Sequence, residues 1–212
     1  MFYVQASGGT FTSTGSDCNT ACKYLEAAPT DQSIEIVWAT AALFCYPSGS
    51  NLGASNCESN SIYSNAAGQD ASRASATAIG KGMANTNQAY ARVSNGGGAG
   101  GAATSTYAAG VAWAYSNNGK ADWHLPSKDE LNQLCKWNRG VAWTSDAFVC
   151  TGGTSNSATY GANTSVFTTD GYHSSSEDGV NSSWFQSFNI GGWQSNGFKV
   201  GLTGVRSVRA FG

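Results

Sequence analysis

Short apolar and polar runs alternate along this chain, and glycine, asparagine or serine separates most of them. Runs rich in β-branched and aromatic residues between such turns are typical of strands. The polar triplet Thr30-Asp31-Gln32, for example, separates two of these runs and predicts a turn between them. We therefore expect strands at residues 2–5, 24–29, 34–38, 184–188, 197–202 and 205–211.

Two stretches have the apolar spacing of helices. In residues 106–115, aromatic or branched side chains recur every four residues, which places them on one helical face. Residues 85–93 predict a shorter helix. The glycine-rich residues 96–101 lie between the two and predict a flexible loop.

The clearest local signal is a helix that begins after Ser127. Ser127 and Glu130 form a capping box, because each side chain can accept a hydrogen bond from the other residue's backbone N–H group. Leu131, Leu134 and Cys135 then give the helix one apolar face.

Composition narrows the range of functions. Charged residues are only 11% of the 212-residue chain, and its net charge is −2. The chain lacks the basic surface that nucleic acids require, so we expect no nucleic-acid partner. No apolar stretch is long enough to span a membrane, so we expect no membrane insertion. The length fits a single domain, residues 1–212, that can bury a core without a metal or cofactor.

The six cysteines favour disulfides. Fifteen connectivities are open, and proximity in the sequence favours Cys18–Cys22, Cys45–Cys57 and Cys135–Cys150. Zinc fits less well, because there is no paired Cys-x-x-Cys and both histidines are distant. The Cys45–Cys57 bridge would tether a long polar surface excursion at residues 46–76.

Disulfides form in oxidising compartments. We expect an extracellular protein on a cell or virion surface, as one domain of a longer chain. A strand pattern follows Met1 directly, which agrees with this expectation, although a native start at Met1 fits the sequence equally well.

Several phrases along nearly the whole chain, in a specific joint order, resemble the bacterial DUF1566 family, also called the Lcl C-terminal domain family. They are Phe2-Tyr3-Val4, Leu25-Glu26-Ala27-Ala28-Pro29, Ala78-Ile79-Gly80-Lys81-Gly82 leading to Ala84-Asn85-Thr86, Asp122-Trp123-His124-Leu125-Pro126-Ser127-Lys128-Asp129-Glu130-Leu131, Ser174-Ser175-Ser176-Glu177, and Val205-Arg206-Ser207-Val208-Arg209-Ala210-Phe211.

The resemblance implies an α+β, C-type-lectin-like fold with paired terminal strands, two main helices and a loop-rich second half that forms the binding face. Residues 2–5 would then pair with residues 205–211. Relatives of this fold include adhesins that bind sulfated glycans and variable proteins of diversity-generating retroelements. Formylglycine-generating enzymes are more distant. This chain departs from many relatives in carrying Tyr172-His173 where they have Tyr-Trp, which makes His173 a candidate changeable position.

The resemblance to variable proteins implies a diversified region at residues 173–204. Retroelements mutate adenines, chiefly in asparagine codons, and such codons cannot yield Lys, Gln, Glu, Met or Trp. Most residues of the region belong to the set that such codons can reach by mutation of adenines. Between them stand residues outside that set, which we call unreachable: Glu177, Trp184, Gln186, Trp193, Gln194 and Lys199. The expected ligand-binding residues are His173, Asp178, Val180, Asn181, Phe185, Ser187, Ile190, Trp193, Ser195, Asn196, Phe198, Val200 and Leu202.

Aromatic residues in this region divide between two expected roles. Trp184 and Phe188 lie four residues apart, which places them on the same face of a strand, and we expect them in the core. We expect Trp193 and Phe198 to be exposed, because they lie among turn residues and offer the rigid contact area of binding hot spots.

The pattern around His173 does not indicate an enzyme. No Gly-x-Ser-x-Gly frame surrounds the three following serines, so we expect them to hydrogen-bond the backbone in a turn. His124 is expected to be a partly buried structural residue. Arg206 and Arg209 are expected on opposite faces of a strand, at least one of them structural.

Three hypotheses follow for function. The first is a non-enzymatic, diversified receptor or adhesin module that binds a protein or glycan on another cell or particle. The second is a fixed lectin-like adhesin that binds polyanionic glycans through surface Lys and Arg. The third, an oxidase, needs a free redox-active thiol. No cofactor is expected; calcium stays open because of the many loop Asp and Asn, without EF-hand spacing. An oligomer is also open.

Overall fold

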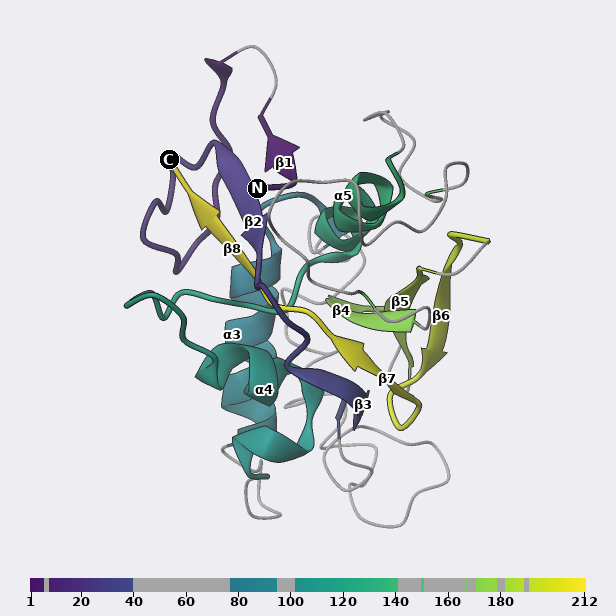
Figure 1. Cartoon of the computed structure of the whole chain (residues 1–212). Helices are drawn as coiled ribbons and strands as arrows, with labels where there is room; N and C mark the ends of the chain where they lie inside the picture. The colour runs from purple at the N-terminus through teal and green to yellow at the C-terminus, as the bar shows by residue number, and fades with distance from the viewer. Residues whose placement is uncertain are drawn as a thin grey trace.

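The computed structural model describes residues 1–5, 8–39, 77–94, 102–140, 150, 167, 171–178, 182–188 and 191–212 (Figure 1). These residues form a mixed α+β fold, with three α-helices, one 3-10 helix and two sheets. The predicted polar excursion at residues 46–76 and the predicted loop at residues 96–101 lie outside the described residues.

The smaller sheet joins the two ends of the chain (Figure 1). Its order is β1-β2-β8, all antiparallel, with β1 at Tyr3–Val4, β2 at Tyr24–Ala27 and β8 at Val208–Phe211. The predicted direct pairing of the terminal strands is wrong, because β2 lies between them. Leu25 of β2 pairs with Tyr3 on one side and Ala210 on the other, and the three side chains are buried in one cluster.

The larger sheet carries most of the second half of the chain. Its order is β3-β7-β4-β5-β6, with β3 at Ser33–Val37, β4 at Gly171–Glu177, β5 at Ser182–Ser187, β6 at Gln194–Phe198 and β7 at Leu202–Val205. β4 and β7 are parallel, and the other neighbours are antiparallel. Among the described residues, β3 and β6 form the two edges.

Two predicted strands at the C-terminal end are placed differently in the structure. The strand expected at residues 197–202 is wrong: a turn, closed by the Gly201 N–H donating to the Phe198 carbonyl at 2.8 Å, separates β6 from β7. The strand expected at residues 205–211 is split between the two sheets. The chain leaves β7 at Arg206, whose guanidinium group turns inward to Asp31 at 2.6 Å.

The described residues contain three α-helices, one more than the two main helices that the family resemblance implies, and each corresponds to a helix predicted from the sequence pattern. They are α3 at Gly82–Ser94, α4 at Ala108–Ala114, preceded by η3 at Thr104–Thr106, and α5 at Lys128–Arg139. α4 packs against α3, β3 and β7, whereas α5 packs against β4 and β5. Helices therefore cover different parts of the larger sheet.

The predicted capping box of α5 is confirmed. The Ser127 hydroxyl accepts a hydrogen bond from the Glu130 N–H at 3.3 Å, and the Glu130 carboxylate accepts one from the Ser127 N–H at 2.8 Å. Leu131, Leu134 and Cys135 are completely buried, as the apolar face predicted. These residues pack with Tyr172 and Phe188 of the sheet region.

Two of the three expected disulfides are present. Cys18 bonds to Cys22, and Cys135 of α5 bonds to Cys150. The expected Cys45–Cys57 bridge lies outside the described residues. Such bonds are compatible with an extracellular location. Within the described residues, no helix is long and apolar enough to cross a membrane.

Candidate functional site

Exposed apolar residues gather along strand β6 and the turn that follows it. Trp193 is 42% exposed, Phe198 63%, Val200 40% and Leu202 60%. Asn196 lies between them and is also exposed. We call Trp193, Asn196, Phe198, Val200 and Leu202 the β6–β7 rim. Large exposed apolar side chains close together in the sequence are candidates for an interaction surface.

One face of the β5–β6 pair supports Trp193. The rings of Trp193 and Phe185 meet edge to face, with centroids 5.3 Å apart. Ser195 lies directly across from Phe185. Gly197 gives the Phe185 ring its space, since a Cβ at Gly197 would lie 3.1 Å from that ring. Phe185 is therefore half-buried, with its ring against Trp193 and the glycine backbone.

Asn196 belongs to the opposite face of the same strand pair. Its amide donates to the Asp178 carboxylate at 2.5 Å, and the Ser182 hydroxyl donates to the same oxygen at 3.3 Å. Trp184 lies across from Asn196, and the Lys128 ammonium sits 3.7 Å from the Trp184 ring centroid. The edge strand thus presents different side chains on its two faces.

Buried side chains fix the backbone beneath the rim. The Lys199 ammonium forms an ion pair with the Glu177 carboxylate and lies 4.8 Å from the centre of the Trp38 ring. The Lys199 carbonyl accepts hydrogen bonds from the N–H groups of Trp38 at 2.8 Å and Ala39 at 3.2 Å. Both the side chain and the backbone of Lys199 therefore hold the turn between Phe198 and Val200.

Two glutamines fix the other end of the strand pair. Gln186 is fully buried; its amide donates to the Gly192 carbonyl at 2.9 Å and accepts from Asn132 of α5 at 3.2 Å. Gln194 donates to the Lys128 carbonyl at 2.7 Å. These bonds tie β5 and β6 to helix α5.

The predicted ligand-binding role of two residues is corrected by the structure, because His173 and Ser187 are both buried. The His173 ring nitrogen Nε2 lies 2.8 Å from the Ile36 carbonyl oxygen, and burial lowers the pKa of His173 to about 4. A neutral, enclosed imidazole is not available to a ligand.

The remaining predictions for this region have mixed outcomes. The predicted exposure of Trp193 and Phe198 and the predicted burial of Phe188 are confirmed. Trp184 is only half-buried, because Lys128 rather than the apolar core covers its ring. Three expected binding residues lie outside the described residues: Val180, Asn181 and Ile190.

Sequence reasoning missed one exposed apolar residue close to this edge of the fold. Ile34 of β3 is 66% exposed, and β3 pairs with β7, which carries Leu202. Strand alternation alone would place Ile34 and Ile36 on the same face. The pairing of β3 with β7 has a register shift between Ser33 and Ile36, and this irregularity, which the sequence does not signal, accompanies the opposite exposure of the two isoleucines.

The two arginines near the C-terminus form ion pairs within the protein. Arg206 pairs with Asp31, and Arg209 pairs with Glu26 at 3.4 Å and with Asp122 at 3.1 Å. Both arginines are buried, so both are structural. None of the described Lys or Arg side chains belongs to the rim.

The serines after His173 are buried in β4 rather than in a turn, which corrects that expectation. Ser174 donates to the Trp184 carbonyl at 3.0 Å, and Ser176 accepts from the Lys128 N–H at 3.0 Å. His124 is fully buried, 3.5 Å from the Glu130 carboxylate. Among the described residues, no group of three His, Cys, Asp or Glu side chains is arranged to hold a metal ion.

A scan of protein-family models finds no match to this chain, and a search of curated protein sequences finds none either.

Proposed function

We propose that this protein is a non-enzymatic, extracellular display domain whose β6–β7 rim binds a ligand and varies between copies of the gene. In this proposal the fold is C-type-lectin-like and related to the DUF1566 family. The observation that supports this proposal is that the residues of this region separate by role: some side chains bond within the protein and act as anchors, whereas the rim side chains are exposed.

The separation follows the chemistry of adenine-directed mutation. Asparagine codons changed at adenine cannot encode Lys, Gln or Glu, and in this region those residue types are the anchors Glu177, Gln186, Gln194 and Lys199. The exposed Asn196, Phe198, Val200 and Leu202 all belong to the reachable set. Trp193 is an exception, because it is exposed yet unreachable, and we assign it the role of a constant contact.

The chemistry of the rim favours a protein ligand over a polyanionic glycan. Its side chains are apolar or uncharged, and aromatic and aliphatic groups with such exposure supply hot-spot contacts. A sulfated glycan needs Lys or Arg at the contact, and Lys199, the one described cation within the turn of the rim, is committed to Glu177. The fixed-lectin alternative is for this reason the weaker one.

Two displayed libraries of the full chain test the proposal. In the rim library, positions 196, 198, 200 and 202 carry mixtures of residues that an asparagine codon can reach. In the matched anchor library, positions 177, 186, 194 and 199 carry the same mixtures. Folding is measured by resistance to protease, and binding by selection against a panel of defined purified proteins.

We expect most rim variants and few anchor variants to fold, and specific binders to emerge from the rim library alone. Equal loss of folding in the two libraries would contradict the separation of roles. A well-folded rim library that yields no binder to any protein on the panel would contradict the binding function.

A further inference from the structure

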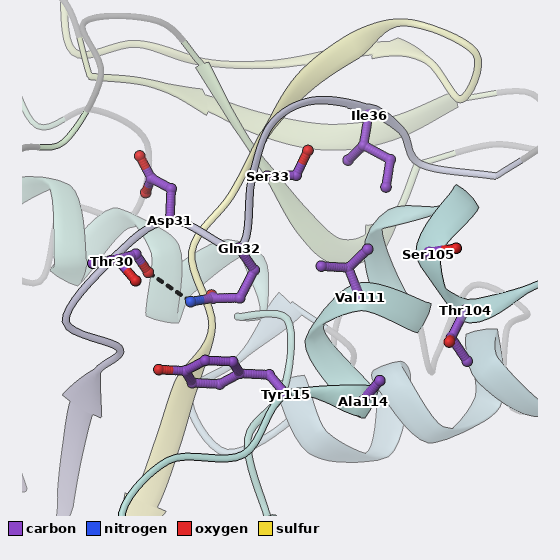
Figure 2. Close-up of a pocket in the computed structure, with 10 residues that line it drawn as sticks. All are labelled: Thr30, Asp31, Gln32, Ser33, Ile36, Thr104, Ser105, Val111, Ala114 and Tyr115. Carbon is purple, nitrogen blue, oxygen red and sulfur yellow. Dashed lines mark hydrogen bonds between the residues drawn. The ribbon is translucent and has the colours of Figure 1, made fainter.

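A cleft of about 420 Å³ lies on a part of the molecule distinct from the β6–β7 rim (Figure 2). One wall is the segment that joins β2 to β3 together with the start of β3, and the other is η3 and α4. Figure 2 shows Val111 and Ala114 of α4, and Tyr115 directly after the helix, opposite Gln32 and Ile36. Clefts of this size commonly hold small ligands.

The lining of the cleft has a polar part and an apolar part, and both walls contribute to each. Residues 30–33 contribute hydroxyl, carboxylate and amide groups, and η3 adds the hydroxyls of Thr104 and Ser105. Ile36, Val111 and Ala114 supply aliphatic carbon, and Tyr115 supplies a ring. A ligand that fills the cleft must therefore be polar along one edge and apolar on one face.

The polar wall is fixed before any ligand arrives. The Gln32 amide donates to the Thr30 carbonyl at 2.6 Å and accepts from the Ser207 N–H at 2.6 Å. The Asp31 carboxylate accepts from Arg206 at 2.6 Å and from the Tyr172 hydroxyl at 3.0 Å. A preformed wall reduces the entropy that binding must offset.

Charge excludes ionic ligands from this cleft. Asp31 is the one charged residue in its lining, and Arg206 already neutralises it. An anion would meet the Asp31 carboxylate without a free cation, and a cation would have to compete with the buried Arg206. A wholly apolar ligand would cover the hydroxyls of the cleft without bonding to them, which is unfavourable.

We propose that this cleft binds a neutral saccharide ring, with the hydroxyl edge of the sugar against residues 30–33 and its C–H face against Val111 and Tyr115. Sugar hydroxyls both donate and accept, as do the Thr and Ser hydroxyls of the cleft. The proposal concerns a second site and does not depend on the function proposed for the rim.

An NMR titration of the full ¹⁵N-labelled chain tests this site. The probes are the methyl pyranosides of glucose, galactose, mannose and N-acetylglucosamine, with glucuronate as the anionic comparator. For any sugar that binds, short linear oligomers are titrated as well. They show whether the site takes a free monosaccharide or one unit of a glycan chain. We expect amide shifts at residues 30–36 and 104–115 with at least one neutral sugar, and at least tenfold weaker binding of glucuronate.

Two tryptophan substitutions provide the matched pair. Ala114 is exposed and lines the cleft, so Ala114→Trp fills it without disturbing the core and is expected to weaken sugar binding at least tenfold. Ala121 is exposed and lies outside the lining, so Ala121→Trp is expected to leave binding unchanged. The amide spectrum of each variant reports whether it is folded.

Three outcomes would overturn the proposal. They are the absence of shifts with every neutral sugar, equal binding by the two tryptophan variants, and shifts confined to the β6–β7 rim. None of these outcomes would affect the rim libraries, so failure of the cleft and failure of the proposed function are distinguishable.

Discussion

The buried ammonium group of Lys199 pairs with the carboxylate of Glu177, which joins the turn after β6 to the end of β4. The neighbours of Lys199 in the sequence, Phe198 and Val200, are exposed. One inward residue thus holds two outward ones in place. This arrangement lets a surface change its side chains while its backbone stays fixed.

Removing one partner of the Lys199–Glu177 pair is expected to destabilise the protein strongly. Lys199→Met leaves the Glu177 carboxylate, whose side chain is 11% exposed, without its cation, and such losses cost about 3–5 kcal/mol. Chemical denaturation of the two single variants and of the Lys199→Met/Glu177→Leu double variant measures the coupling. A loss below about 1 kcal/mol in both single variants would show that the pair does not hold the turn.

Rim and core leucines are expected to respond differently to the same truncation. Leu202→Ala removes a side chain that is 60% exposed, and we expect a change within about 0.5 kcal/mol. Leu131→Ala removes a completely buried side chain and is expected to cost about 2–5 kcal/mol. The free energy of unfolding in urea checks both values. Comparable losses would mean that Leu202 supports the fold rather than displaying a contact.

His173 is expected to make stability depend on pH. Its pKa is lowered from 6.5 to about 4 by burial, so the unfolded chain binds this proton more readily than the folded one. The stabilisation is complete above pH 6.5 and is lost as the pH falls towards 4, by about 3 kcal/mol at 1.36 kcal/mol per pKa unit.

The pH effect of His173 must be separated from that of Asp129. Burial raises the pKa of Asp129 to about 6, which changes stability in the opposite direction, because the folded state then binds the proton more readily. The measurement is therefore the difference between the native chain and His173→Asn in unfolding free energy from pH 4 to 8. A difference that does not vary with pH would contradict the buried, neutral imidazole.

The two described disulfides are expected to contribute unequally. Cys135–Cys150 spans 15 residues and its removal is expected to cost about 3 kcal/mol in the chain-entropy description. Cys18–Cys22 spans only 4 residues and is expected to contribute about 2 kcal/mol. The unfolding free energies of the two double Cys→Ala variants, measured by chemical denaturation, show which disulfide contributes more. A larger loss for the shorter bridge would contradict it.

Local patterns predicted local structure well. The capping box and apolar face of α5 depend on residues within eight positions of one another, and both are present. The exposure of Trp193 and Phe198 also followed from their immediate neighbours, which are turn residues unable to cover them.

Long-range partners could not be predicted in the same way. β2 pairs with both terminal strands, and nothing in the sequence of residues 2–5 distinguishes β2 from β8 as a partner. The burial of His173 depends on the carbonyl of Ile36, which is 137 residues away. The cleft beside α4 likewise arises from segments far apart in the sequence, which meet through the buried cluster that contains Ile36, Ala108 and Ala112.

The central claim is that the rim varies while its anchors do not, and sequencing of this gene across a natural population of its source organism tests it most directly. We expect adenine-directed substitutions at codons 196, 198, 200 and 202, with codons 177, 186, 194 and 199 constant. A rim that is uniform between copies, or substitutions spread equally over rim and anchor codons, would contradict the account.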